Sequence, residues 1–396
     1  MATTRTFDPQ TPAADIAAAF PESIQGKTII ITGVSPNSLG LATAFTFASQ
    51  SPANLIITGR SSEKLEASIH SLKLKYPNTH YHALLMDLSS QSSVRAAATQ
   101  LNNDTTIPTI DILINNAGVM AIPTLTLTED GIETTFATNH LGHFLFTNLI
   151  LPKIIKAAQS SSSSSPPPRI INLTSFAHHF SPIRFSDINF TLPHTSLPAS
   201  EHPDFQKTEL FTGTSHSTST STSPYTGFFS YAQSKTANIL FTISLNEKLY
   251  TKYGISSFAV HPGAVDTNIN RYAEPGEVER ALKRVQELGF DARQKEPRVG
   301  ANTVVWGAVD GGLVPGGNLD GKGVYLAECA VDEVNVAGFA RDREGAERLW
   351  GSASTLSIDN HSVNTYHGFS YDTIPERMQS YTTIIEVMEF ELDLFL

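Results

Sequence analysis

A tyrosine and a lysine four residues apart, Tyr231 and Lys235, are the residues of this sequence that most directly suggest chemistry. The surrounding segment is typical of a helix, and side chains at this spacing lie on the same helical face. A cation beside a phenol favours the phenolate and lowers the pKa of the phenol from about 10. A tyrosine with such a pKa can give a proton to a carbonyl oxygen or take one from an alcohol. Considered alone, the pair is explained as well by an exposed surface helix.

A glycine-containing turn joins the first predicted strand to the first predicted helix. In such a turn, backbone N–H groups and the positive end of the helix dipole face a bound pyrophosphate. Gly33 would permit the tight turn, and Gly40 would permit either close helix packing or the approach of a phosphate. We expect the following residues of this turn to bind a cofactor: Thr32, Gly33, Ser35, Asn37, Leu39 and Gly40.

The ends of the next three predicted strands carry further candidates for cofactor binding. An NAD site usually has an acid at the end of the second strand, whereas this chain has Arg60, which suits the 2′-phosphate of NADP. A solvated arginine is the alternative. Asp87, followed by Leu88, would accept a hydrogen bond from the adenine amine or would cap the next helix. Small and amide residues after the fourth strand leave room for a cofactor ribose, or form an ordinary turn: Asn116, Ala117 and Gly118.

The segments that must position these residues alternate between two patterns along the chain. Short β-branched runs predict strands over residues 27–32, 54–58, 80–86, 110–115, 169–174, 255–260 and 323–327. Helical spacing of apolar residues predicts helices over residues 40–49, 62–76, 90–101, 128–159, 231–253, 274–290, 297–309 and 341–350. Strands that alternate with helices form a parallel sheet covered on both faces. With right-handed crossovers, the predicted fold is α/β, a doubly wound parallel sheet in a single Rossmann-type domain.

Two low-complexity stretches interrupt this alternation. A serine run and three prolines at 160–168 predict a solvated loop at the bottom of the sheet. Residues 191–227 are rich in Ser, Thr, Pro and His, and this insertion could line a substrate site or be disordered. We expect an N-terminal extension over 1–25, the domain over 26–358, and a C-terminal tail over 359–396. The tail mixes apolar and acidic residues, and packing on the body or binding a partner would both suit that pattern.

Composition excludes several functional classes. The net charge of −11 argues against a nucleic-acid partner, because phosphate binding needs a basic face. The single cysteine, Cys329, cannot form a disulfide within the chain, and we expect it to be buried in a late strand. The sequence has no HExxH or CxxC motif, so we predict no metal site, and His143 is expected to pack within a helix. It has no signal-peptide pattern and no run near the ~20 apolar residues of a membrane span, which predicts a cytoplasmic location.

In this order the motifs resemble those of the short-chain dehydrogenase/reductase family, most closely the branch of retinol dehydrogenases and related fungal reductases. The resemblance covers roughly residues 25–358. Besides the glycine turn, the Asn-Asn-Ala-Gly segment and the Tyr/Lys pair, it includes Thr138-Asn139-His140-Leu141-Gly142-His143, Asn172-Leu173-Thr174-Ser175 and His261-Pro262-Gly263-Ala264-Val265-Asp266-Thr267.

The resemblance implies a role for each of these residues. Ser175 would hydrogen-bond the substrate carbonyl, and Tyr231 would be the general acid in reduction and the general base in oxidation. Lys235 would hold the nicotinamide ribose and lower the pKa of Tyr231, while Asn139 would anchor a water in the proton relay. Contacts with the nicotinamide amide and the pyrophosphate would come from Pro262, Gly263, Val265 and Thr267.

The glycine turn departs from the family pattern Thr-Gly-x-x-x-Gly-x-Gly. Asn37 and Ser38 stand where the middle glycine would fall, and the turn is one residue longer. Asn adopts positive φ more readily than most residues, so we expect the turn to survive. The property that the departure would affect is the affinity for the cofactor. The separation of Ser175 from Tyr231 is also long, because the insertion over 191–227 lies between them.

Together these features predict an NADP(H)-dependent oxidoreductase that acts on a small lipophilic ketone, aldehyde or alcohol. Residues 268–296, a polar helical segment after the Pro-Gly turn, are expected to act as a substrate lid. Use of NAD(H) and assembly into a homodimer stay open. The alternative function is a non-catalytic NADP-binding sensor or scaffold.

Overall fold

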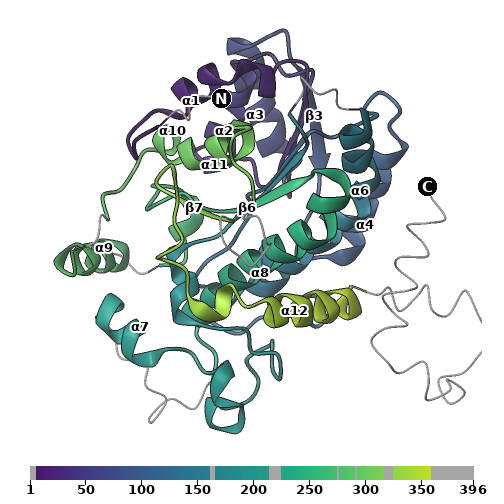
Figure 1. The fold of residues 1–396 in the computed structure, drawn as a ribbon. Coiled ribbons are helices and arrows are strands. Elements are labelled where there is room, and N and C mark those ends of the chain that lie inside the picture. The colour runs from purple at the N-terminus through teal and green to yellow at the C-terminus, as the bar shows by residue number, and fades with distance from the viewer. Residues whose placement is uncertain are drawn as a thin grey trace, which may run out of the picture.

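The computed structural model describes residues 6–160, 166–213, 224–273, 276–289, 292–315 and 324–357. Within these residues, one eight-stranded sheet forms the centre of the molecule, in the order β3-β2-β1-β4-β5-β6-β7-β8 (Figure 1). The strands are β1 (Thr28–Ile31), β2 (Asn54–Gly59), β3 (His80–Leu85), β4 (Ile112–Asn115), β5 (Arg169–Leu173), β6 (Ser256–His261), β7 (Tyr325–Ala327) and β8 (Ala330–Val331).

The first seven strands are parallel, and only the pairing of β8 with β7 is antiparallel. The central strand β1 is a run of Thr and Ile whose residues are all buried, as expected for a strand covered on both faces. The strands β2 and β3 lie on one side of β1, and β4 and the later strands lie on the other. The order in which strands are added to the sheet therefore reverses between β1 and β4. The doubly wound α/β fold predicted from the sequence is confirmed.

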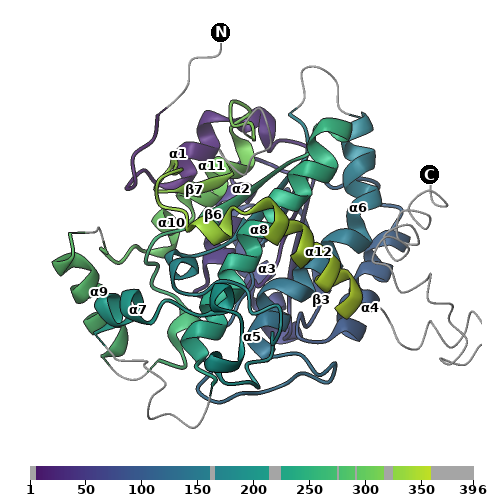
Figure 2. The ribbon, with the colours of Figure 1, turned by 60° about the horizontal axis from the view of Figure 1, so that its bottom comes forward.

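Each face of the sheet is covered by its own layer of helices. Ile30 faces the layer formed by α4 (Gln91–Asn103), α6 (Gly142–Ser160), α8 (Gly227–Tyr253) and α12 (Arg343–Leu356). Its neighbours Ile29 and Ile31 face the layer formed by α1 (Ala13–Ala19), α2 (Leu39–Ala48), α3 (Ser62–Lys75) and α11 (Asn302–Val309). The alternation follows from the two-residue period of a strand. Helix α12 crosses over α8 on the outside (Figure 2).

The second half of the chain differs from the predicted elements in three places. The predicted helix over 297–309 is two pieces, α10 (Pro297–Gly300) and α11, and the two-residue strand β8 was not predicted. Cys329 is buried as expected but lies in the turn between β7 and β8, where it and Glu328 both have positive φ. The predicted strand over 323–327 therefore ends before the cysteine. Helix α1, at the N-terminus, packs against α11 through fully buried Ile16.

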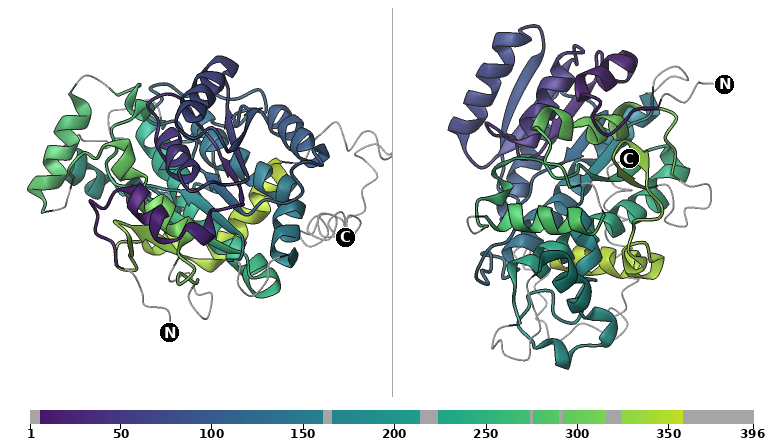
Figure 3. Two further views of the ribbon diagram at one scale, coloured as in Figure 1. Left: turned by 90° about the horizontal axis from the view of Figure 1, so that it is seen from above. Right: turned by 90° about the vertical axis from the view of Figure 1, so that its left-hand side faces the viewer.

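Two short helices stand outside the layers that cover the sheet. Helix α7 (Phe205–Thr212) belongs to the insertion, and α9 (Glu277–Glu287) belongs to the expected lid segment. The two helices pack against each other and lie side by side in the views of Figures 2 and 3. The remaining short elements are η1 (Pro21–Ser23), α5 (Thr134–Phe136), η2 (Ala137–Leu141), η3 (Phe176–Phe180), η4 (His194–Ser196), η5 (Ala199–Glu201), η6 (Asn268–Asn270) and η7 (Gly338–Ala340).

Parts of the predicted segments lie outside the described residues. These are the first five residues of the N-terminal extension, the middle of the serine-proline stretch (161–165), the Ser/Thr repeat of the insertion (214–223), residues 274–275 and 290–291 of the expected lid, residue 323 of the last predicted strand, the final residue of the predicted domain (358) and the C-terminal tail (359–396). None of the helices in the described part of the chain is long and apolar enough to cross a membrane. In the same residues, no group of three or more His, Cys, Asp and Glu side chains is placed to hold a metal ion.

Candidate active site

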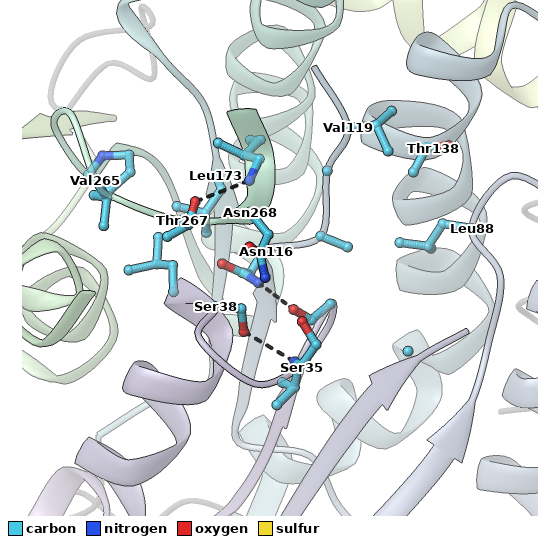
Figure 4. A pocket seen from close by; sticks show the side chains of 18 of the residues that line it. Ser35, Ser38, Leu88, Asn116, Val119, Thr138, Leu173, Val265, Thr267 and Asn268 are labelled. Atoms are coloured by element: carbon cyan, nitrogen blue, oxygen red, sulfur yellow. Dashed lines mark hydrogen bonds between the residues drawn. The ribbon is translucent and has the colours of Figure 1, made fainter. Parts of the chain in front are cut away.

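A pocket of about 770 Å³ opens along the carboxyl ends of β1, β2, β4, β5 and β6 (Figure 4). In open α/β sheets this edge, where the strand order reverses, is the one at which ligands bind. Most residues predicted from the sequence line it: Gly33, Ser35, Leu39, Arg60, Asp87, Leu88, Asn116, Ala117, Gly118, Ser175, Tyr231, Lys235, Pro262, Gly263, Val265 and Thr267. Four predicted residues, Thr32, Asn37, Gly40 and Asn139, are not part of this lining.

Two distant segments bring Ser175, Tyr231 and Lys235 together in this pocket. Ser175 follows the end of β5, and the other two lie one turn apart on α8. The side chain of Ser175 lies near the hydroxyl of Tyr231. The ammonium of Lys235 lies 5.3 Å from the centre of the Tyr231 ring and donates a hydrogen bond of 3.0 Å to the carbonyl of Leu173. A hydroxyl, a phenol and an ammonium thus face one void.

The pKa values of the pair differ from the sequence-based expectation. Burial raises the pKa of Tyr231 to about 12, and the nearby side chain of Ser175 opposes this rise only in part. Burial also lowers the pKa of Lys235 to about 7. The expectation that the ammonium lowers the pKa of the phenol is therefore wrong for this structure. Desolvation dominates because both charged forms would be buried, and Lys235 directs its ammonium to a backbone carbonyl.

The start of helix α8 is fixed by buried contacts, and these place Tyr231. Glu133 is fully buried, and its carboxylate accepts hydrogen bonds from the hydroxyl of Ser230 (2.6 Å) and from two backbone N–H groups at the start of α5. The hydroxyl of Thr226 caps α8 by accepting from the backbone N–H of Phe229 (3.1 Å). At Gly227 a Cβ atom would overlap the carbonyl oxygen of Ile122. The first turn of α8 is thus held in one position.

Asn139 lies outside the pocket lining, in the π-helical turn η2, which directly precedes α6. Its side-chain oxygen accepts from the backbone N–H of Val119 (2.8 Å). Its amide nitrogen donates to the carbonyl of Val119 and to the hydroxyl of Ser234, both at 2.9 Å. Asn139 therefore ties α8, between the tyrosine and the lysine, to the segment after β4. Single π turns of this kind often mark functional sites.

A histidine that the sequence analysis assigned to packing connects two parts of the site. His143 Nδ1 lies 3.0 Å from the carbonyl oxygen of Asn139, and Nε2 lies 2.8 Å from the hydroxyl of Thr32. Because a carbonyl can only accept, Nδ1 carries the proton and Nε2 accepts from the threonine. Burial lowers the pKa of His143 to about 4, so the ring is neutral. Thr32 in turn accepts from the backbone N–H groups of Asn116 and Ala117 (2.9 and 3.0 Å).

The glycine turn keeps its shape without the middle glycine of the family pattern. Asn37 has a φ of 60°, the left-handed conformation that Asn tolerates. Ser38 caps α2 by accepting from the backbone N–H groups of Leu41 (3.0 Å) and Ser35 (3.1 Å). At Gly40 a Cβ atom would lie 2.8 Å from the amide nitrogen of Asn116, so this glycine serves close packing.

At the far end of the pocket, two cations follow β2. Arg60 lies 4.0 Å from the carboxylate of Asp87; the arginine is exposed and the aspartate is half-buried. Lys64, on the first turn of α3, lines the same end and was not predicted. Asp87 does not cap the next helix, since Ser90 does so by accepting from the backbone N–H of Ser93. Position offers a signal for Lys64, because it lies in the first turn of the helix that follows β2 and Arg60.

The loop after β6 is held in place by contacts with Lys295. Its backbone pairs with Lys295, whose N–H donates to the carbonyl of Ala264 (2.7 Å) and whose carbonyl accepts from Asp266 (3.0 Å). The ammonium of Lys295 is buried and pairs with Glu328 at 2.5 Å. At Gly263, which has a φ of 84°, a Cβ atom would meet both of these side chains. The ion pair thus fixes the loop that lines one side of the pocket.

Comparison with known proteins agrees with this geometry. The short chain dehydrogenase family matches residues 27–186. Retinol dehydrogenase 13 of Homo sapiens is 33% identical over 336 residues, which are 84% of this chain and 85% of that protein. The chain belongs to the short-chain dehydrogenase/reductase family. The oxidoreductase fscI of Fusarium equiseti is 40% identical over 257 residues, 65% of this chain and 94% of the relative.

A solved structure of an uncharacterized protein from Mycobacterium Paratuberculosis has the same fold, with a TM-score of 0.56 and 25% identity. It covers 89% of this chain, and 98% of its own length is matched. The predicted family and its branch, retinol dehydrogenases with a fungal reductase relative, are confirmed. Membership of the short-chain dehydrogenase/reductase family assigns to the protein a dehydrogenase or reductase activity that uses a nicotinamide cofactor.

Short-chain dehydrogenase/reductase motifs alone did not identify every residue of the pocket. The lining includes further side chains from the same strand ends and from the start of the lid segment: Val34, Ser38, Thr58, Ser61, Lys64, Met86, Val119, Thr138, Leu173, Thr174, His261, Asn268, Ile269 and Arg271. Several of these are sequence neighbours of predicted residues. The signal that could have found Thr58, Met86, Leu173, Thr174 and His261 is their position at the carboxyl end of a strand.

Proposed function

We propose that the protein is an NADP(H)-dependent oxidoreductase that interconverts a small lipophilic ketone or aldehyde and the corresponding alcohol. The observation that carries the proposal is the convergence of Ser175, Tyr231 and Lys235 in one pocket at the carboxyl edge of the sheet. When bound, the nicotinamide supplies or accepts the hydride. The reaction also needs a group that gives a proton to the substrate oxygen or takes one from it. The buried phenol of Tyr231 is the group in this position.

Each side chain of the trio has a distinct part in this proposal. Tyr231, with a pKa of about 12, is protonated at neutral pH and donates its proton to the carbonyl oxygen of the substrate. Ser175, whose side chain lies near the hydroxyl of Tyr231, orients the same oxygen. Lys235 presents its ammonium beside the ring and holds a ribose hydroxyl. Asn139 supports a water in the proton relay, and Asn116, Ala117 and Gly118 leave room for the ribose.

The preference for NADP(H) rests on the charges at the far end of the pocket. Arg60 and Lys64 line the wall after β2, where an NAD site places an acid. We expect Arg60→Asp to weaken NADPH binding at least tenfold and to bring the affinities for NADPH and NADH together. The control is Arg298→Asp, an exposed arginine on α10 outside the pocket lining. Unchanged relative affinities in Arg60→Asp would contradict the preference.

The decisive experiment replaces Tyr231 with phenylalanine, which removes only the phenolic oxygen. Tyr231→Phe keeps the ring in place, so NADPH binding measured by fluorescence stays unchanged while ketone reduction falls by roughly 10²–10⁴-fold. The matched control is Tyr81→Phe, a half-buried tyrosine on β3 whose hydroxyl donates to the carbonyl of Tyr76 and which is absent from the pocket lining. Full activity of Tyr231→Phe would refute the assignment. Tight NADPH binding by the wild-type protein without turnover of any ketone or aldehyde would instead support a non-catalytic sensor or scaffold.

A further inference from the structure

A fully buried histidine, His178, is bonded to the backbone of Ser175. Its ring atom Nδ1 lies 2.8 Å from the carbonyl oxygen of Ser175, and its own backbone N–H donates to the same oxygen at 3.1 Å. Ser175 is the N-cap of η3, and its hydroxyl accepts from the backbone N–H of Ala177 in the same turn (3.2 Å). Because a carbonyl group and its Cα lie in one rigid peptide plane, bonds that fix this carbonyl also restrict the direction of the Ser175 side chain.

The second ring nitrogen of His178 contacts a segment that is distant in sequence. Nε2 accepts a hydrogen bond of 3.2 Å from the backbone N–H of Ala337, the residue before η7. Because the carbonyl of Ser175 can only accept and the N–H of Ala337 can only donate, Nδ1 carries the proton and the ring is neutral. Burial lowers the pKa of His178 to about 3, which agrees with a neutral ring. The ring therefore connects Ser175 to the segment after β8.

Helix α8 holds the same turn through the residue that follows Lys235. The hydroxyl of Thr236 lies 3.1 Å from the carbonyl oxygen of His178 and 2.7 Å from that of Ser181. These bonds set the position of the histidine relative to the helix that carries the phenol of the site. His178 is not part of the pocket lining, so its effect on a bound substrate would pass through Ser175.

We propose that His178 is a positioning residue for the reaction, because it fixes the hydroxyl of Ser175 where the substrate oxygen binds. This inference rests on the proposed function. The neighbouring His179 offers a comparison, since its Nε2 lies 3.1 Å from the carbonyl oxygen of Asn335 and so contacts the same late segment. The ring bond of His179 goes to Asn335 and not to Ser175. Only His178 is therefore expected to affect the serine.

The test measures kcat, and the KM for NADPH, with whichever of 2-heptanone, acetophenone and benzaldehyde the wild-type protein reduces fastest. His178→Leu removes both ring hydrogen bonds, and we expect kcat to fall roughly 10- to 100-fold while the KM for NADPH stays within about twofold. His178→Asn places an amide N–H near the position of Nδ1, so kcat should return to within about threefold of the wild-type value. The matched control is His179→Leu, which leaves the bond to Ser175 in place and should change kcat by less than about twofold.

A double-mutant cycle with Ser175→Ala shows whether His178 acts through the serine. In the Ser175→Ala protein, adding His178→Leu should change the remaining kcat by less than about twofold, because the hydroxyl that the histidine positions is already absent. Thermal unfolding shows which variants are folded. If His178→Leu does not fold, Ala337→Pro takes its place in the cycle, with an expected loss in kcat of about threefold or more. Ala337 has a φ of −61°, which proline adopts, so this variant removes the N–H that donates to Nε2 and keeps the backbone angle.

Three results would overturn the inference while the proposed function stands. The first is an unchanged kcat in folded His178→Leu, or a loss that His179→Leu matches. The second is a His178→Asn protein as impaired as His178→Leu, because the bond to the Ser175 carbonyl would then be irrelevant. The third is an equal loss from His178→Leu with and without the serine hydroxyl. A wild-type protein that reduces none of the three carbonyl compounds, or a fully active Ser175→Ala, would instead overturn the proposed function, and the inference with it.

Discussion

Tyr231 and Lys235 are both buried, and burial moves their pKa values in opposite directions. The phenol is held protonated with a pKa of about 12, and the ammonium loses its proton with a pKa of about 7. This state suits donation of a proton to a carbonyl oxygen, whereas alcohol oxidation needs the phenolate. A bound positive charge beside the ring would lower the pKa of the phenol by favouring its anion.

The first prediction at the residue scale concerns this pKa. In the cofactor-free protein, we expect Tyr231 to stay protonated at pH 10.5, above the ordinary tyrosine value of about 10. The measurement is ¹³Cζ tyrosine NMR between pH 7 and 11, with the Tyr231 signal assigned by its loss in Tyr231→Phe. A midpoint below pH 10 would show that the lysine, and not burial, dominates.

The second prediction at this scale concerns His143, which joins the carbonyl of Asn139 to the hydroxyl of Thr32. His143→Leu leaves both groups buried without this partner, at a cost of about 1–3 kcal/mol in unfolding free energy. Because Thr32 holds the turn at Asn116 and Ala117, we also expect weaker NADPH binding. Urea unfolding and NADPH titration measure the two effects.

A matched variant separates hydrogen bonding from volume at this position. His143→Gln offers an amide that can both donate and accept, so it should recover part of the lost stability and affinity. Equal losses in the Leu and Gln variants would mean that the histidine acts through its shape alone. No loss in either variant would contradict the proposed connection between the two halves of the site.

At the scale of single elements, helix α8 carries Tyr231 and Lys235, and its start is held by Glu133, by the cap Thr226 and by close packing at Gly227. In Gly227→Ala the new methyl group would overlap the carbonyl of Ile122, so we expect a loss of about 1–3 kcal/mol and a displaced Tyr231. Gly351→Ala on α12 meets nothing within 4 Å and should stabilise its helix by about 0.5–1 kcal/mol. Thermal unfolding and ketone reduction measure both variants. A Gly227→Ala protein as stable and active as the wild type would show that α8 can shift.

The elements that the sequence predicted are those with strong local patterns. Strand β1 is a buried β-branched run and α8 has long helical spacing, so both follow from side-chain periodicity. Strand β8 is two exposed residues, and its hairpin places Glu328 and Cys329 at positive φ without the Asn-Gly signal of such turns. The link from Thr32 to His143 could not be predicted, because it joins residues 111 positions apart.

At the scale of the whole molecule, the topology explains why these distant segments meet. The chain crosses the sheet from β3 to β4, and the crevice opens where β1 and β4 lie side by side. The carboxyl ends of β1, β4 and β5 deliver the glycine turn, the Asn-Asn-Ala-Gly segment and Ser175 to that crevice. The insertion leaves the sheet intact and adds α7 beside α9 of the expected lid segment (Figure 3).

We also predict that the stability of the whole molecule falls in acid. Burial lowers the pKa of six histidines from 6.5 to about 3 or 4: His140, His143, His178, His179, His194 and His261. The unfolded chain binds protons at these positions near pH 6.5, whereas the folded chain does not until about pH 4 or below. Stability is therefore complete above about pH 7 and falls as the pH drops from about 6.5 towards 4.

This response can be measured as the urea midpoint at pH 7.5, 6 and 5, and one variant isolates a single contribution. His140 is fully buried among Phe136, Phe144 and Phe241, so His140→Phe keeps an aromatic ring there and removes the proton-binding site. The slope of unfolding free energy against pH between 6 and 4 should then decrease by up to about 1.4 kcal/mol per pH unit. An equal slope in the variant and the wild type would mean that His140 is protonated in the fold. A wild-type midpoint that is the same at pH 5 and pH 7.5 would contradict the acid response as a whole, because the buried histidines would then have ordinary pKa values.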